Sequence, residues 1–355
     1  MHTIIEPARP RRAFRSLAIG ASVLCVVPIA WAATSLGGDG GPRAELVNLP
    51  TRSVVPSTTI DSLDGHSGAL RVAFLTKEDV EQVPALVKRF GGDVMLPGVR
   101  SITLPQGNTN FAFVTLKPFA EKAGNYVNTY HVGLWPGERR NMPNNYENPI
   151  GFIEVTPETM DLRLSTHFTL RSFITHDQDK VWPKYVVMRE ELLDKLELVL
   201  AELQLQGVPT RNVVVLSGFR TPQYNRRAAF EGAAWASRHQ FGDAADLIID
   251  ADGNGRMDDL NRDGVVNFRD TDVINRAVEK VEQRHPELVG GLGLYRAMGP
   301  SGPFAHIDVR GTRARWSNAA APARRRAVNA IAEAPTRVTP TGTCKAPPEF
   351  AHLCK

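Results

Sequence analysis

Cysteine is scarce in this chain, with three residues among 355. Cys25 lies in an apolar run near the N-terminus, whereas Cys344 and Cys354 flank a short C-terminal segment that contains two prolines. In an oxidising compartment this pair would close a small disulfide loop, and the alternative is two free thiols in a tail. We expect the disulfide between Cys344 and Cys354.

Strong charge and nucleic-acid motifs are also lacking. The net charge is only +4, and no aromatic–basic motif or known binding module is present, so we expect no nucleic-acid partner. Arginines gather near both ends of the chain, which favours an anionic surface as a partner, although ordinary solubility explains them equally well. A hydrophobic content of 42% is enough for a full core or for two small domains.

Long apolar runs are lacking too. The run from Leu17 to Ala33 is ~17 residues long and contains Pro28, which makes it short for a helix that spans a membrane. Several arginines precede it, and Ala30-Trp31-Ala32 offers a small-x-small cleavage site. Residues 1–33 are therefore predicted to be an export signal peptide, and the alternative is a retained membrane tether.

The stretch Arg11-Arg12-Ala13-Phe14-Arg15 resembles the twin-arginine export signal R-R-x-F. An ordinary positively charged leader would show the same arginines. In either case we expect the rest of the chain to lie outside the cytoplasm, in the periplasm or beyond it.

The remainder divides into four predicted segments. Residues 34–66 are rich in glycine, proline and hydroxyl residues and predict a flexible spacer. Residues 67–158 predict a small mixed α/β domain or extension, with helical spacing over Glu78–Phe90, although Pro84 within this range disfavours a helix. Its strands are expected at Leu70–Leu75, Asn110–Leu116, Tyr130–Pro136 and Ile150–Val155. Residues 159–320 predict the functional domain, and residues 321–355 a C-terminal tail.

The segment 159–320 predicts an α+β fold, with a small antiparallel sheet flanked by helices. An amphipathic helix is expected at Val187–Gln204 and a buried strand at Val213–Leu216. His176 lies in a polar loop beside two aspartates; a second metal site is conceivable there, but we expect a solvated loop.

Two separated pairs of residues predict a zinc site. His239 and Asp246 are seven positions apart, on either side of a tight turn that leads into a strand, and His306 follows later in the chain. Two imidazoles and one carboxylate, with the fourth position left to water, form a common catalytic zinc shell. Because cysteine is absent from this set, a closed structural site is disfavoured. A polar turn that merely precedes a buried strand is the alternative.

Several motifs around these residues resemble one family. The pattern S-x-H-x-x-G-x-A-x-D followed by H-x-D is similar to that of zinc D-Ala-D-Ala metallopeptidases, which act on bacterial peptidoglycan. Ser217-Gly218-Phe219-Arg220-Thr221 resembles the family segment S-G-x-R-[ST], and Asn225 follows at the matching position. Gly290 to Tyr295, the His306 motif and Arg315-Trp316 resemble the murein-endopeptidase branch. The resemblance covers residues 160–317 and implies a zinc cleft over the sheet.

The resemblance also implies roles for neighbouring residues. Arg220 would lie in the active site, where it would clamp a substrate carboxylate or stabilise a developing oxyanion, and Ser237 would bind substrate. Carboxypeptidase members have a glutamate three residues before the last histidine ligand, and Pro303 occupies that position here. Asp308 is then the best local candidate for the general base; alternatively, it orients a zinc ligand.

An acidic insert at 250–272 predicts structural calcium. The twelve residues from Asp259 to Asp270 match an EF-hand or dockerin-like loop, with a glycine at the sixth position. The predicted calcium ligands are Asp259, Asn261, Asp263, Val265 through its carbonyl, Asn267 and Asp270. An overlapping, weaker loop would use Asp250, Asp252, Asn254 and Asp258. The alternative is an acidic surface loop without a metal.

These features together predict a zinc D,D-endopeptidase that cleaves peptide cross-links or stems of peptidoglycan. The missing glutamate turns the prediction away from a D,D-carboxypeptidase, which stays an alternative. A non-catalytic, metal-stabilised cell-wall-binding module is a second alternative. A calcium-dependent adhesion or scaffold protein is disfavoured by the intact His/Asp/His set.

Overall fold

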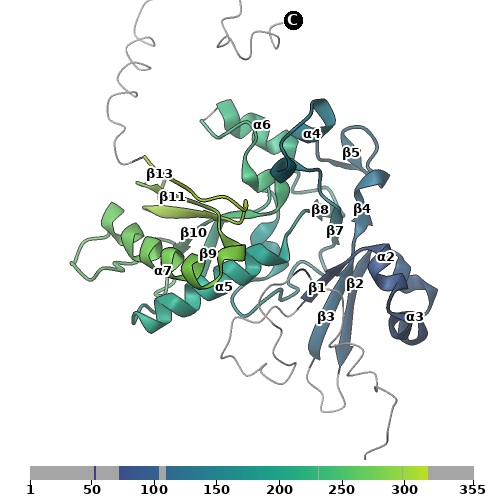
Figure 1. Ribbon diagram of the computed structural model, residues 1–355, viewed down its shortest axis with the longest axis horizontal. Helices are drawn as coiled ribbons and strands as arrows, with labels where there is room; N and C mark the ends of the chain where they lie inside the picture. Colours follow the sequence, from purple (N-terminus) through teal and green to yellow (C-terminus); the bar gives the residue numbers. More distant parts are fainter. Residues whose placement is uncertain (1–51, 53–71, 104–108, 231, 298, 319–355) are drawn as a thin grey trace, which may run out of the picture. The chain divides into compact units, whose positions relative to one another are not determined.

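The computed structural model describes Arg52 and residues 72–103, 109–230, 232–297 and 299–318 (Figure 1). The predicted export signal, the predicted C-terminal tail with the expected Cys344–Cys354 disulfide and, apart from Arg52, the predicted spacer lie outside these residues. Among the described helices, none has the length and apolarity needed to cross a membrane.

The fold is α+β, as the sequence predicts, and its largest sheet has five strands in the order β13-β11-β12-β10-β9 (Figure 1). Neighbouring strands are antiparallel except for β11 and β13, which are parallel. The strands are β9 (Val213–Ser217), β10 (Ala244–Ile249), β11 (Gly291–Tyr295), β12 (Phe304–Asp308) and β13 (Ala314–Ser317).

The two faces of this sheet differ in chemistry. Side chains alternate between faces along a strand, and residues paired across strands share a face. Asp246 pairs with His306, His306 pairs with Gly293, and Tyr295 pairs with Phe304, so one face carries polar and aromatic groups. The intervening residues are apolar and fully or almost fully buried: Ala245, Leu247, Leu292, Ala305 and Ile307.

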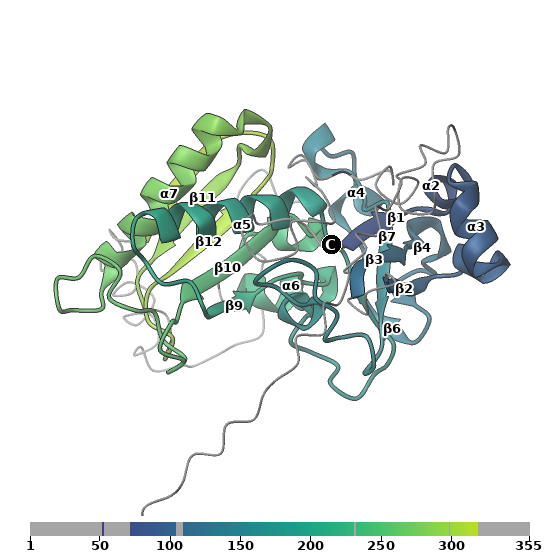
Figure 2. The same cartoon turned by 90° about the horizontal axis from the view of Figure 1, so that it is seen from below.

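Two long helices, α5 (Glu190–Leu205) and α7 (Thr271–Arg284), pack side by side, and α7 also contacts β11 and β12 (Figure 2). The helix predicted at Val187–Gln204 is thus confirmed with a later start. Its apolar stripe is buried, and the buried Lys195 Nζ reaches Glu282 of α7 at 2.7 Å. The charge on Lys195 is paired across the helix interface, as a buried charge requires.

The region before residue 158 forms smaller sheets. Strands β1 (Val72–Leu75), β3 (Thr109–Thr115) and β2 (Gly98–Thr103) form one sheet, with α2 (Lys77–Glu81) and α3 (Pro84–Phe90) in the connection from β1 to β2. The single helix predicted at 78–90 is two helices, because Pro84 lacks an amide hydrogen and begins α3 instead of continuing α2. Strands β4 (Lys117–Pro118), β7 (Gly151–Val155) and β8 (Lys184–Val186) form a second sheet.

The other elements are short. The strand predicted at Tyr130–Pro136 is reduced to β6 (Tyr130–His131), which pairs with β5 (Tyr126–Val127). Two further helices are α4 (Pro136–Arg139) and α6 (Pro222–Phe230). The 3-10 turns are η2 (Gly92–Met95), η3 (Phe119–Glu121), η4 (Asn144–Tyr146), η5 (Leu170–Phe173), η6 (Arg238–Phe241), η7 (Phe268–Asp270) and η8 (Pro286–Leu288).

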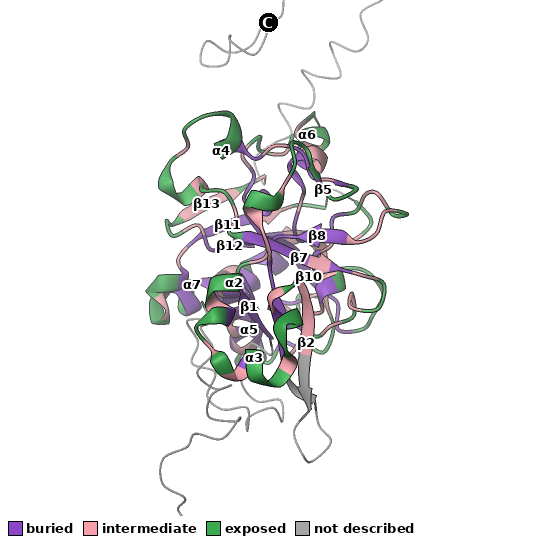
Figure 3. Cartoon of the chain, turned by 90° about the vertical axis from the view of Figure 1, so that its right-hand side faces the viewer, coloured by how far each residue is buried: buried purple, intermediate pink, exposed green. Residues whose placement is uncertain are grey.

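One hydrophobic cluster joins both predicted segments. Trp135 and Phe152, from before residue 158, are fully buried in the same cluster as Phe173 and Ile307. β7 also pairs with β8 across that boundary. Figure 3 shows the buried strands, whereas α2 and α3 expose their outer faces. Part of the described region before residue 158 therefore shares a core with the segment that carries the predicted site, whereas Leu75, Leu86 and Phe113 belong to a second, smaller cluster.

Candidate metal centre

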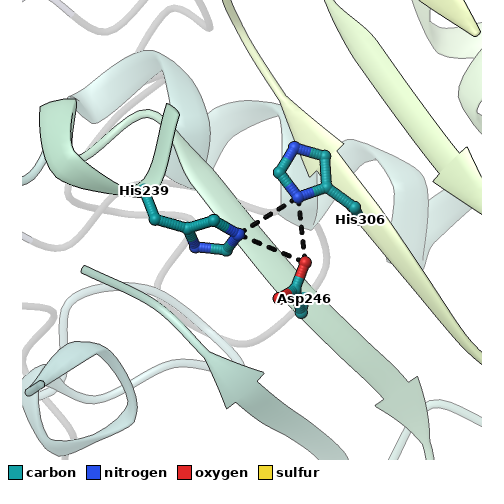
Figure 4. Close-up of side chains that lie close together, drawn as sticks. All are labelled: His239, Asp246 and His306. Atoms are coloured by element: carbon teal, nitrogen blue, oxygen red, sulfur yellow. Dashed lines mark hydrogen bonds and ion pairs between the residues drawn. The ribbon is translucent and has the colours of Figure 1, made fainter. Parts of the chain in front are cut away.

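Three different elements bring His239, Asp246 and His306 together (Figure 4). His239 lies in η6, Asp246 on β10 and His306 on β12, and all three side chains are buried. The turn after η6 requires glycine, because Gly242 has a φ of 67° and an added Cβ would lie 2.4 Å from the backbone of Val187. Gly242 thus lets the chain pass from His239 into β10 at close range.

The three potential ligand atoms form a small triangle. His306 Nδ1 lies 2.9 Å from Asp246 Oδ1 and 3.1 Å from His239 Nε2, and His239 Nε2 lies 3.2 Å from Asp246 Oδ1. Zinc bonds such atoms at about 2.0–2.2 Å, which separates tetrahedral neighbours by roughly 3.3–3.6 Å. The triangle needs to open by only a few tenths of an ångström, so the donor set fits zinc in both chemistry and spacing.

Hydrogen bonding fixes the tautomer of His239. Its Nδ1 lies 2.7 Å from the carbonyl oxygen of Gly218, and a carbonyl only accepts, so Nδ1 carries the proton. The lone pair of Nε2 therefore faces Asp246 and His306. Burial also lowers the pKa of His239, which favours the neutral imidazole that a metal ion needs.

His306 is held from its other ring nitrogen by Asp308. His306 Nε2 donates to Asp308 Oδ2 at 3.1 Å, which leaves Nδ1 for the cluster. Burial disfavours the charged ring, but hydrogen bonds to Asp246 and Asp308 outweigh burial and raise the pKa of His306 to about 9. The raised pKa favours a ring that is protonated at Nδ1 as well, and His306 would have to lose that proton to act as a metal ligand.

The role of general base predicted for Asp308 needs correction. Asp308 is completely buried and also accepts hydrogen bonds from Gly291 N and Arg310 Nε. Burial opposes its ionisation, but these partners and His306 hold its pKa well below the usual range, so it is a poor proton acceptor. Its contacts fit the alternative role, which is to orient His306.

Arg220 orients the carboxylate of the cluster. Its Nη2 donates to Asp246 Oδ2 at 2.7 Å, and its Nε donates to Ser217 Oγ at 2.7 Å. Oδ1 of Asp246 is thereby left for the histidines. The predicted substrate clamp is thus already engaged with Asp246, although the Arg220 side chain also lines the cavity described next.

The cluster lies at the wall of a cavity of about 690 Å³. Ser237 lines it, as its predicted contact with substrate requires. Among the described residues, Asp246 is the one carboxylate in the lining, so no free glutamate or aspartate faces the cluster. Pro303, at the position of the family glutamate, is buried and does not line the cavity.

His176 is a site residue that sequence reasoning placed in a solvated loop. The structure places it in the lining of the same cavity. Its neighbour Thr175 anchors the loop, because Thr175 Oγ1 donates to Phe219 O at 3.0 Å and accepts from Thr221 N at 3.2 Å. Asp177 also pairs with Arg227 of α6. His176 is exposed, as the predicted solvated loop requires, and its place in the cavity lining is what the sequence did not reveal.

The predicted calcium loops have the expected turns but differ in compactness. In the loop 259–270, Gly264 has a φ of 86°, and Asp259 accepts from the backbone amides of Asp263 and Gly264. Asp270 accepts from Asn261 N and Asn267 N. Val265 offers its carbonyl to Asn267 Nδ2.

In the weaker predicted loop, which begins at Asp250, three carboxylates lie close together. Potential ligand atoms of Asp250, Asp252 and Asp258 lie within 4.8 Å of one another, and Asp250 accepts from Asn254 N. In the described part of the chain, Asp259, Asp263 and Asp270 form no group this tight. Calcium itself stays a prediction for both loops.

The chain matches no protein-family model, no curated protein and no solved structure. The functional assignment therefore depends on the geometry of the site and on the motifs in the sequence.

Proposed function

We propose that this protein is a zinc-dependent D,D-endopeptidase that hydrolyses peptide cross-links or stems of peptidoglycan in the periplasm or outside the cell. The observation that carries the proposal is the convergence of His239 Nε2, Asp246 Oδ1 and His306 Nδ1 at the wall of a substrate-sized cavity. Bound zinc would supply Lewis acidity and lower the pKa of a coordinated water towards ~7.

The chain's own residues prepare this site for one ion. Gly218 O, Arg220 and Asp308 fix His239, Asp246 and His306 respectively, each on the side away from the cluster. Such outer contacts orient ligands and limit the reorganisation that metal binding requires. The site is therefore arranged for metal before any substrate enters.

We assign the proton transfer to His176. Hydrolysis of an amide requires a group that takes a proton from water and passes it to the leaving nitrogen. Asp308 is unsuited to this role, and Asp246 belongs to the cluster. His176 is the one imidazole in the described cavity lining besides the two cluster histidines, and imidazole is the usual choice for proton transfer near neutral pH.

The choice of an endopeptidase rests on the position of Pro303. A carboxypeptidase of the resembling family would carry a glutamate there, and among the described lining residues Asp246 of the cluster is the one carboxylate. The missing glutamate also favours an alternative that is not an enzyme, namely a metal-stabilised module that binds peptidoglycan without cleaving it. Calcium in the insert would be structural in either case, and a D,D-carboxypeptidase stays a possible outcome of the test.

The test uses purified protein loaded with zinc and incubated with cross-linked muropeptide dimers. Conversion of dimers to monomers that a chelator stops and added zinc restores is the expected result. The matched control is His239→Ala, which removes a cluster residue and should be inactive. Loss of a terminal D-alanine alone would identify a carboxypeptidase. Binding without any turnover would overturn the enzyme assignment in favour of the binding module.

A further inference from the structure

A row of three aromatic side chains lies beside the cluster. Tyr295 on β11, Phe304 on β12 and Trp316 on β13 all line the cavity that contains His306. The Trp316 ring lies 5.2 Å from that of His306 between centroids, and the Tyr295 ring stacks on Phe304 at 4.7 Å with an interplanar angle of 4°. The strand register puts Tyr295 and His306 on the same face of the sheet.

One hydrogen bond determines how the Tyr295 hydroxyl is used. Trp316 Nε1 lies 2.6 Å from Tyr295 Oη. An indole nitrogen only donates, so the tyrosine oxygen is the acceptor in this contact. The hydroxyl hydrogen must then point elsewhere, and Oη makes no other hydrogen bond to the described residues. Because Tyr295 lines the cavity, a hydrogen-bond acceptor of a bound substrate can approach the hydroxyl from there.

The position of this hydroxyl is fixed by packing. A Cβ added to Gly293 would lie 2.4 Å from Trp316 Cε2 and Nε1, so only glycine lets the indole lie against β11. Phe304 holds the phenol ring from one side, and the indole holds its oxygen. Burial also raises the pKa of Tyr295, which keeps the hydroxyl protonated and able to donate.

We propose that Tyr295 is a catalytic hydrogen-bond donor to the carbonyl oxygen of the scissile amide, with Trp316 as its positioning residue. This inference rests on the proposed function. As water adds to the carbonyl carbon, negative charge develops on that oxygen, and a preorganised donor stabilises the charge more than it stabilises the ground state. The C–N bond then breaks and the water proton reaches the leaving nitrogen through His176, while Tyr295 keeps its own proton.

The test compares Tyr295→Phe with the wild type on muropeptide dimers. The substitution keeps the ring and its stack but removes the hydroxyl. We expect kcat to fall by roughly 10²–10³-fold, with KM and bound zinc little changed. The control is Tyr126→Phe, because Tyr126 is 46% exposed and does not line the cavity. Its kinetics should match those of the wild type.

A second variant separates positioning from folding. Trp316→Phe keeps an aromatic ring but removes the donor to Oη, and we expect kcat to fall by roughly five- to tenfold with zinc retained. If Tyr295→Phe does not fold, the kcat of Trp316→Phe decides whether Tyr295 acts as the hydrogen-bond donor. An active wild type with unchanged kcat in the folded variants overturns the role of Tyr295 alone. A wild type without chelator-sensitive hydrolysis overturns the proposed function as well.

Discussion

Each residue of the His239–Asp246–His306 cluster is held by one partner outside the cluster. Gly218 O fixes the tautomer of His239, Arg220 takes one oxygen of Asp246, and Asp308 takes the second nitrogen of His306. Because carbonyl and carboxylate groups only accept, the proton on His239 Nδ1 and the proton on His306 Nε2 point away from the centre of the cluster. The geometry at this scale explains why these residues suit a divalent ion.

The role of Asp308 can be tested by Asp308→Asn. The amide keeps the shape but weakens the contact with His306 Nε2, so zinc affinity should fall by about 10–100-fold. Zinc titration with a competing chelator measures this, and hydrolysis at saturating zinc should largely recover. Asp272→Asn, at an exposed position on α7, is the matched control. Unchanged zinc affinity with abolished turnover would instead restore Asp308 as the base.

The proposed proton transfer predicts a defect in His176→Gln. Glutamine keeps polarity but cannot exchange a proton near neutral pH, so kcat should fall by about 10²–10⁴-fold with zinc content unchanged. His285→Gln is the control, because His285 follows α7 and does not line the cavity. Wild-type rates in His176→Gln would exclude this role.

At the scale of elements, alternation along strands separates chemistry from packing. β12 places Phe304, His306 and Asp308 on the site face, and it places Ala305 and Ile307 in the core. A shift of one residue in its pairing with β10 would exchange these faces and would remove His306 from Asp246. The register of β12 is therefore decisive for the cluster.

The insert between β10 and α7 should bind calcium and stabilise the fold. At free calcium about 100-fold above the dissociation constant, binding adds about 2.7 kcal/mol, which corresponds to a rise in Tm of roughly 5–10 °C. Differential scanning calorimetry with calcium and with magnesium measures this. Because its carboxylates are already gathered, Asp250→Asn should remove more of the shift than Asp263→Asn. An equal Tm with and without calcium would contradict the prediction that either loop binds calcium.

The contact between α5 and α7 should weaken in acid. Hydrogen bonds from Lys280, with help from Arg284, lower the pKa of Glu202. Because the pKa of Glu202 is lower in the folded state than in the unfolded chain, where it is ~4.3, the ionised carboxylate stabilises the fold above that pH. This stabilisation is lost as the pH falls through the lower pKa of the folded state. The cations are more than half exposed, so Glu202→Gln should lower Tm by only roughly 1–4 °C at pH 7.

Thermal unfolding of the wild type and of Glu202→Gln between pH 7 and pH 3 tests whether this stabilisation is lost in acid. The difference in Tm between the wild type and Glu202→Gln should shrink towards pH 3. Glu121→Gln, which affects an exposed pair with Lys117, is the control and should show little difference at any pH. A difference that grows in acid would contradict the assignment.

At the scale of the whole molecule, the site-bearing segment does not have a core of its own. Trp135 Nε1 donates to Gln240 O at 2.7 Å, directly beside His239 in η6, and the Trp135 ring packs against Phe152 and Phe219. The region before residue 158 thus supports the turn that carries His239. The same region also contributes Tyr146 to the cavity lining, and Arg238 of η6 donates to Asn145 O.

A chain of residues 159–320 alone should therefore fold poorly. Removing Trp135 and Phe152 exposes apolar surface of the shared cluster and leaves Gln240 O without its donor. We expect dye binding typical of exposed apolar surface and no cooperative thermal transition, whereas residues 52–318 should unfold cooperatively. A sharp transition with wild-type zinc affinity in the shorter chain would show that the segments are independent.

Local patterns in the sequence were enough for the α+β class and for α5, because hydrophobic periodicity is carried by residues close together along the chain. The grouping of His239 and Asp246 with the distant His306 depended on several separated motifs and on the family that they resemble. The single helix predicted at Glu78–Phe90 was wrong, because Pro84 begins a second helix there.

Other features were decided only by the tertiary structure. The burial of Asp308 behind His306, the place of His176 in the cavity, the contact of Trp316 with Tyr295 and the core shared across residue 158 join positions that are mostly far apart in the chain. Such contacts depend on strand order, register and the packing of side chains, and these arise from the free energy of the entire fold. The sequence by itself therefore determined which groups are available for chemistry, and the tertiary structure decided which of them face the same space.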